Sequence, residues 1–193
     1  EYRRQRQMCI RDRHNNVTNF VRLLDMIGND QTFIYASSAS VYGNCKYDEA
    51  NEDTPFDSAY NMYDMTKQAI DSYVMASKKV QSRVYGLRFG TVNGYSPVLR
   101  NDVMLNAMTT AAWNEGKVNL YSANTRRSIL AISDLVSAVS SILKSNRPSG
   151  GIYNLASFTS TSGEMASAVS ETFDVPVNKI VLDSGTTIKG NEK

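Results

Sequence analysis

Residues 58–77 read Ser58-Ala-Tyr-Asn-Met-Tyr-Asp-Met-Thr-Lys-Gln-Ala-Ile-Asp-Ser-Tyr-Val-Met-Ala-Ser77, a stretch without Gly or Pro that predicts a long helix. Thr32–Ala36 is a short apolar run before it, and Ser82–Phe89 is a second one after it. Runs of this length and composition are typical of buried strands. A strand, a helix and a second strand in this order indicate a right-handed crossover between parallel strands. The stretch therefore predicts an α/β fold with a largely parallel sheet.

The alternation of helices and strands extends over the rest of the chain. Apolar residues at helical spacing predict a helix over Asn15–Ile27, which Gly28 ends. Gly90–Pro97 is expected to form a loop. Further helices are expected over Asp102–Glu115, Ser133–Leu143 and Thr161–Phe173, and further strands over Lys117–Tyr121, Ser128–Ile132 and Gly151–Leu155.

Tyr63 and Lys67 lie four residues apart in the predicted helix and therefore on one of its faces. A free tyrosine has a pKa of about 10, and a neighbouring ammonium lowers that pKa because it favours the phenolate. Ser37 and Ser38 follow the first predicted strand, at the edge where parallel sheets bind ligands. A serine hydroxyl there can hydrogen-bond both a reacting oxygen and the phenol. These groups can take a proton from an alcohol while another group takes the hydride.

The composition sets further bounds on the protein. A chain of 193 residues can bury a core and holds one or two domains. The single histidine disfavours a histidine-rich metal site, so we predict no metal. Two cysteines give no disulfide framework, which suits a reducing, cytoplasmic location. There is no apolar run of about 18 residues, so we expect no membrane partner.

The first thirteen residues differ from the rest of the chain. They hold five arginines and show no apolar periodicity. We interpret residues 1–13 as a non-native or disordered leader; the alternative is an arm that binds nucleic acid. Beyond this leader, acidic residues slightly outnumber basic ones, which disfavours nucleic acid as a partner.

Six segments carry short patterns in a fixed order. They are Asn15–Leu24, Phe33–Gly43, Tyr63–Lys67, Leu87–Gly94, Arg127–Asp134 and Gly151–Leu155. In this order they resemble the extended short-chain dehydrogenase/reductase family, the NAD-dependent epimerases and dehydratases of nucleotide sugars. The resemblance implies a Rossmann-type, doubly wound parallel sheet with a small α+β substrate-binding lobe.

The resemblance also implies a role for each matching position. Tyr63 would be the general acid/base, Lys67 its cation, and Ser38 would hold the substrate oxygen. Residues implied to contact the cofactor are Asn16, Ala36, Ser37, Tyr63, Lys67, Phe89 and Thr91. Residues implied to contact the substrate are Ser38, Thr91, Asp102, Asn106, Asn119, Tyr121 and Arg127, with the Arg127 guanidinium suited to a phosphate.

The cofactor implied by the resemblance is NAD, with NADP left open. Residues 14–92 and 126–155 would form part of the NAD-binding domain, and residues 93–125 and 156–193 part of the substrate-binding lobe. The family's Gly-x-x-Gly-x-x-Gly loop, which cradles the cofactor pyrophosphate, does not occur in this sequence. We therefore expect an N-terminally truncated fragment of a longer protein.

The preferred function is an NAD-dependent epimerase of a nucleoside-diphosphate sugar that works through a keto intermediate. Ser38-Ala39-Ser40 lacks the acidic pair of the family's dehydratases, which disfavours dehydration. The parent protein is expected to be a homodimer that pairs through the Tyr63 helix. Three alternatives stay open: a one-way NAD(P)-dependent reductase or dehydrogenase, a non-catalytic nucleotide-binding protein, and a fragment that is inactive alone.

Overall fold

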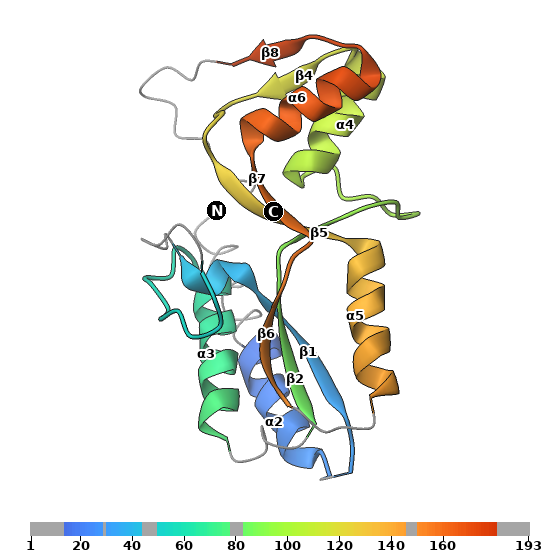
Figure 1. Ribbon diagram of the computed structural model, residues 1–193. Coiled ribbons are helices and arrows are strands. Elements are labelled where there is room, and N and C mark those ends of the chain that lie inside the picture. The colour runs from blue at the N-terminus through green and yellow to red at the C-terminus, as the bar shows by residue number, and fades with distance from the viewer. Residues whose placement is uncertain (1–13, 29, 44–49, 78–82, 146–149, 181–193) are drawn as a thin grey trace. The chain divides into compact units, whose positions relative to one another are not determined.

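The computed structural model describes residues 14–28, 30–43, 50–77, 83–145 and 150–180 (Figure 1). The chain forms two compact units that alternate along the sequence. The first unit comprises residues 1–90 and 136–155, and the second comprises residues 91–135 and 156–193. Residues 126–135, which were expected in the NAD-binding domain, cluster with the second unit.

The first unit is built on a parallel sheet of three strands. Its order is β1 (Phe33–Ser38), β2 (Val84–Phe89) and β6 (Gly151–Leu155). The register places Ser38 opposite Phe89 at the carboxyl ends of β1 and β2. Because parallel strands end at the same edge, the residues that follow β1 and β2 are held close together at that edge.

Helical segments pack against this sheet. They are η1 (His14–Thr18), α2 (Asn19–Met26), η2 (Ala39–Tyr42) and α3 (Met62–Ala76). Helix α3 lies against η1, η2, α2 and β1 (Figure 1). Buried apolar side chains of the helices and of the sheet form the core of the unit: Phe20, Leu24, Tyr35, Ile70, Val74 and Val84.

The N-terminus of α3 is fixed by a cap. The Asn61 side chain accepts a hydrogen bond from the backbone N–H of Asp64 at 2.9 Å, which satisfies one of the free amides of the first turn. Tyr63 lies within this first turn. The cap therefore fixes the backbone that carries the tyrosine.

In the described residues, the second unit includes two small sheets and the helices α4 (Met104–Glu115) and α6 (Ser162–Phe173). One sheet has the order β3 (Thr91–Asn93), β5 (Arg126–Ala131) and β7 (Phe158–Thr161), with β5 antiparallel to β7. The other pairs β4 (Val118–Leu120) with β8 (Val177–Lys179) in parallel. Helices α4 and α6 pack on each other and on β4.

Helix α5 (Ile132–Lys144) begins in the second unit and continues in the first. Within its first turn, the Asp134 carboxylate accepts a hydrogen bond from the Ser157 hydroxyl. The Ser157 oxygen in turn accepts the backbone N–H of Ala131 at 2.8 Å. These contacts tie the end of β5 and the start of α5 to the segment that precedes β7.

The α/β fold class and most of the expected elements are confirmed, whereas the prediction for Gly90–Pro97 is wrong in part. The structure forms strand β3 over Thr91–Asn93, which pairs with β5. Strands β7 and β8 were also not expected. These segments have three or four residues, too few to show a period, and their strand conformation depends on distant partners. Within the ranges that the structure describes, no helix has the length and apolarity needed to cross a membrane.

Candidate active site at the carboxyl edge of the first sheet

Lys67 joins the helix α3 to the end of strand β1. Its Nζ donates a hydrogen bond to the backbone carbonyl of Ala36 at 2.7 Å. The same Nζ lies 5.4 Å from the centre of the Tyr63 ring. The Tyr63 side chain is 44% exposed, so it is accessible to a ligand. The expected pairing of Tyr63 and Lys67 on one helix face is present, and the cation lies beside the phenol.

Burial lowers the pKa of Lys67 below its ordinary value of 10.5, and the negative charge of Asp71 counteracts part of this effect. Asp71 lies one turn further along α3. A partly desolvated ammonium is less screened than one in water, so it acts more strongly on a neighbouring phenolate. The Lys67 ammonium is therefore placed to stabilise negative charge on an oxygen beside it.

Ser38 ends β1 and caps the helical turn η2. Its Oγ accepts two hydrogen bonds, from the backbone N–H of Ser40 at 3.2 Å and from the Ser40 hydroxyl at 2.9 Å. The neighbouring Ser37 is only 2% exposed, and its hydroxyl has no hydrogen-bond partner within the part of the chain that the structure describes. An unsatisfied buried hydroxyl is unfavourable, so it is available to a ligand that reaches this edge.

Asn16 contacts α3 from the N-terminal segment. Its Nδ2 donates to the Thr66 hydroxyl at 3.3 Å, and that hydroxyl donates to the Tyr63 carbonyl at 2.7 Å. Thr66 is buried, so this chain of hydrogen bonds lies inside the unit. Asn16 thus orders the turn of α3 that carries Tyr63, and a contact of Asn16 with cofactor remains a prediction.

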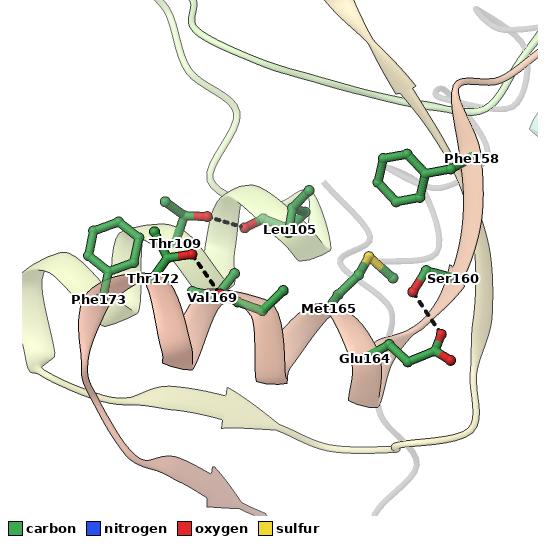
Figure 2. A pocket seen from close by; sticks show the side chains of 10 residues that line it. Leu105, Thr109, Phe158, Ser160, Glu164, Met165, Val169, Thr172 and Phe173 are labelled. Carbon is green, nitrogen blue, oxygen red and sulfur yellow. Dashed lines mark hydrogen bonds between the residues drawn. The ribbon is translucent and has the colours of Figure 1, made fainter.

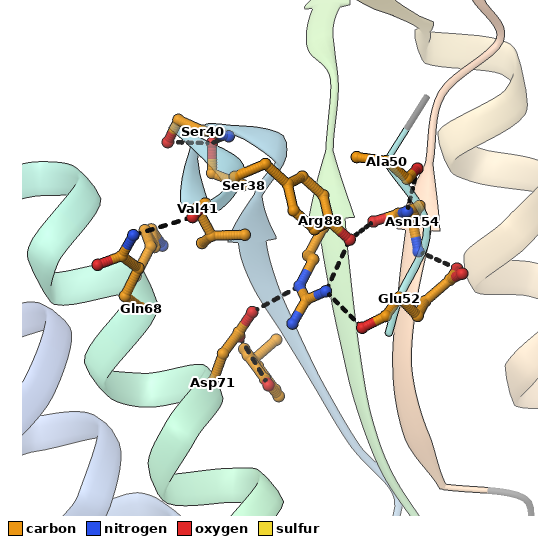
Figure 3. A network of polar contacts seen from close by, with 12 residues as sticks. Ser38, Ser40, Val41, Ala50, Glu52, Gln68, Asp71, Arg88 and Asn154 are labelled. Atoms are coloured by element: carbon orange, nitrogen blue, oxygen red, sulfur yellow. Dashed lines mark hydrogen bonds and ion pairs between the residues drawn. The ribbon is translucent and has the colours of Figure 1, made fainter. Parts of the chain in front are cut away.

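A buried polar network behind these residues was not predicted (Figure 3). At its centre the Arg88 guanidinium donates to the Asp71 carboxylate at 2.8 Å and to the Tyr42 hydroxyl at 2.7 Å. Tyr42 donates to Asn154 Oδ1 at 2.6 Å, and Tyr35 donates to Asp71 at 3.0 Å. The network therefore connects β1, η2, α3, β2 and β6, the elements that surround the candidate site.

Both charges of this network are removed from water. Arg88 is 1% exposed and Asp71 is 0% exposed. Burial raises the pKa of the Tyr35 phenol, and the nearby Asp71 carboxylate raises it further, so Tyr35 stays neutral. Two sequence signals could have revealed the network: an arginine inside an otherwise apolar strand, and an aspartate four residues after Lys67 on the buried side of the helix.

Six of the predicted site residues lie in the second unit. Asp102 forms an ion pair with Arg100 at 2.7 Å, and the hydrogen bond from Arg100 lowers the pKa of Asp102. The Asn106 amide donates to the Arg100 carbonyl at 3.1 Å. The other four are Thr91 on β3, Asn119 on β4, Tyr121 just after β4 and Arg127 on β5. Asp102 and Asn106 are thus brought together at Arg100, while a shared substrate site for all six stays a prediction.

The second unit also contains a mostly apolar pocket of about 420 Å³ between α4, α6 and β7 (Figure 2). Leu105, Phe158, Met165 and Phe173 contribute to its wall. None of the predicted substrate-binding residues lines it. Within the described ranges, no group of three or more His, Cys, Asp or Glu side chains is placed to hold a metal.

The chain is similar to known proteins. A sequence model described as "NAD dependent epimerase/dehydratase family" matches residues 8–156. Protein CapI of Staphylococcus aureus is 33% identical over 144 residues, which cover 67% of this chain and 40% of that protein. This chain therefore spans less than half of that relative.

Solved structures share the fold. The ADP-L-glycero-D-manno-heptose-6-epimerase of Helicobacter pylori is 27% identical with a TM-score of 0.70, covering 87% of this chain and 54% of that one. The UDP-glucuronic acid 4-epimerase of Bacillus cereus, solved with UDP-glucuronic acid and NAD, is 21% identical with a TM-score of 0.73. That match covers 89% of this chain and 55% of that one, so this chain spans about half of each enzyme.

Proposed function

Because the chain belongs to the NAD-dependent epimerase/dehydratase family, we propose that the protein epimerises the sugar of a nucleoside diphosphate through a transient keto intermediate. NAD is the cofactor of this family. The observation that carries the proposal is the position of the Lys67 ammonium. It lies between the Ala36 carbonyl and the Tyr63 ring, next to the strand end that holds Ser38.

The residues of this edge fit the nicotinamide end of NAD. Lys67 presents donors, Ala36 a carbonyl and Ser37 a buried hydroxyl without a partner in the described part of the chain. Such groups suit a ligand with hydroxyl and amide groups, as ribose and nicotinamide have. The glycine-rich loop that would hold the pyrophosphate does not occur in the sequence, so the fit concerns one end of the cofactor.

In this proposal Tyr63 moves the proton. As a phenolate it takes the proton of a sugar hydroxyl, and the O–H electrons form the C=O bond as hydride leaves the same carbon. NAD, when bound, would supply the acceptor and donor of that hydride. Tyr63 then gives the proton back to the oxygen. Lys67 stabilises the phenolate in the first half and Ser38 holds the oxygen throughout.

Parts of the substrate and the assembly belong to the same proposal. The Arg127 guanidinium, exposed on β5, would bind a phosphate of the nucleotide sugar. Helix α3 would pair with its copy in a homodimer. We place the protein in the cytoplasm, and we expect neither nucleic acid nor membrane as a partner.

The experiment uses the complete product of the gene that encodes this chain. We expect it to convert one of a panel of UDP-, ADP- and dTDP-sugars to an epimer, followed by NMR, without accumulation of NADH. Tyr63→Phe should lower the rate by about 10²–10⁴-fold, since it removes the acid/base group. Tyr60→Phe is the matched control because Tyr60 is an exposed tyrosine three residues before Tyr63. NADH formed in proportion to sugar would indicate a one-way dehydrogenase, and an unchanged rate in Tyr63→Phe would contradict the proposed role.

A further inference from the structure

The hydrogen bonds around Ser38 leave its hydroxyl free only to donate a hydrogen bond. A serine oxygen can accept two hydrogen bonds and donate one. Both acceptor positions are taken by Ser40, through its backbone N–H at 3.2 Å and its hydroxyl at 2.9 Å. The proton of Ser38 must therefore point away from Ser40. Ser38 is then available as a donor, while its oxygen has no position left to accept a third hydrogen bond.

From this we propose that Ser40 is a positioning residue that makes Ser38 a hydrogen-bond donor to the substrate oxygen. The inference rests on the proposed function and deepens it, because it decides the path of the proton. A serine that relays a proton must accept one, whereas Ser38 keeps its own. The proton of the sugar hydroxyl passes directly to the Tyr63 phenolate, and Ser38 donates to the oxygen that remains.

The turn that carries Ser40 is fixed to the helix of Tyr63 and Lys67 (Figure 3). The Gln68 amide, one residue after Lys67, donates to the Val41 carbonyl at 2.9 Å. The same nitrogen donates to the Asp57 carbonyl at 2.8 Å. Val41 is fully buried, so this turn has little freedom to move.

The other end of the turn is held as firmly. The Tyr42 hydroxyl is bonded to Arg88 and to Asn154, which belong to β2 and β6. Gly43 follows with a φ of 57°, and a Cβ there would lie 2.8 Å from the Ser58 carbonyl. A donor aimed from a rigid turn needs no reorganisation when charge develops on the substrate oxygen. The geometry thus suits Ser40 for orienting Ser38.

The first test is kinetic and uses the complete gene product. Ser40→Ala removes the hydroxyl that donates to Ser38 but keeps the backbone N–H. We expect kcat to fall by up to about tenfold with KM unchanged, because the variant loses one neutral hydrogen bond that orients Ser38. Ser40→Thr keeps the hydroxyl and should restore kcat. Ser141→Ala is the control, since Ser141 loses a similar hydroxyl bond within α5.

A double-mutant cycle then separates action through Ser38 from any other effect. If Ser40 acts through Ser38, Ser40→Ala lowers kcat no further once Ser38 is alanine. Independent losses in the two variants, or an unchanged kcat in Ser40→Ala alone, would overturn the inference. If Tyr63→Phe and Ser38→Ala both keep full activity, the proposed function itself fails, which is a different result.

A second test does not depend on turnover. Neutron diffraction of the protein locates the deuterium on Ser38 Oγ. A deuterium directed away from Ser40 supports the donor role. A deuterium directed at Ser40 Oγ would show that Ser38 donates to Ser40, and the inference would then be wrong whatever the enzyme's activity.

Discussion

At the scale of single residues, the position of Lys67 has opposite effects on the proposed chemistry and on the stability of the fold. Its ammonium is half-buried between the Ala36 carbonyl and the Tyr63 ring, which favours a phenolate but costs free energy of folding. Burial lowers its pKa, so the charged form is less stable in the folded protein than in the unfolded chain. The desolvated Lys67 ammonium lowers the stability of the fold, which is typical of a group that serves the chemistry of a site.

We predict that Lys67→Met lowers activity while it preserves the stability of the fold near neutral pH. The sign of the pH effect follows from proton linkage. Between the lowered pKa of folded Lys67 and its ordinary value of 10.5, the unfolded chain binds more protons, so wild-type stability rises with pH. Urea unfolding of both proteins across this window should show wild type gaining stability relative to Lys67→Met as pH increases.

The opposite pH dependence would contradict this account of Lys67. If wild type lost stability relative to Lys67→Met as pH rose, the ammonium would be stabilised by folding, and a desolvated Lys67 would be excluded. Lys144→Met serves as a control because Lys144 is an exposed lysine at the end of α5.

At the scale of secondary-structure elements, the buried Arg88–Asp71 pair holds the site together. It joins strand β2 to helix α3 and, through Tyr42, to the turn η2. Attraction between such charges is offset by the loss of hydration, so the intact pair adds little net stability. The pair instead fixes the relative positions of β2, α3 and η2. A structure that separated the two charges would leave each one buried without a partner.

We therefore predict strong coupling between Arg88 and Asp71. Arg88→Met alone should destabilise the fold by about 3–5 kcal/mol, since it leaves the Asp71 carboxylate uncompensated. The double variant with Asp71→Leu should be much closer to wild type than the sum of the single changes. Equilibrium unfolding of the four proteins in urea measures this difference.

An exposed pair provides the matched control. Arg100 and Asp102 form an ion pair of similar length, 2.7 Å against 2.8 Å, but their side chains are 74% and 42% exposed. Breaking it with Arg100→Met should have a far smaller effect, because water replaces the partner. Equal losses of stability at the two pairs would show that burial does not set the cost of breaking them.

At the scale of the whole molecule, α3 presents apolar side chains on the side away from the core. Met65, Ala69, Tyr73 and Ala76 recur at helical spacing and are exposed. Met65 is 52% exposed and Tyr73 is 38% exposed. Two copies of such a stripe can cover each other around a two-fold axis, which supports the proposed homodimer.

We predict that Met65→Glu converts a dimer to a monomer, because two carboxylates would then meet in an apolar interface. Light scattering after size exclusion measures the mass. Trp113→Glu, on helix α4 of the second unit, changes an exposed apolar residue elsewhere and should leave the mass unchanged. A monomeric wild-type protein would contradict the proposed homodimer. A Met65→Glu variant that stays dimeric would show that the dimer pairs through another surface.

Local patterns were sufficient to predict the elements that carry the candidate reacting groups. The helix that carries Tyr63 and Lys67, and the strand that ends at Ser38, follow from periodicity and from the lack of Gly and Pro between residues 58 and 77. A spacing of four puts two side chains on one helix face whatever surrounds them. Chemistry that depends on such near neighbours can be inferred from the chain alone.

Contacts between distant residues could be seen in the folded protein alone. The pairing of β3 with β5, the link from Tyr42 to Asn154 and the burial of Arg88 join segments far apart in the sequence. Whether a polar side chain is buried and satisfied depends on all the elements packed around it, and short strands take their conformation from their partners. The sequence thus determined which groups are candidates for the reaction, and the tertiary packing determined how Ser38, Tyr63 and Lys67 are held.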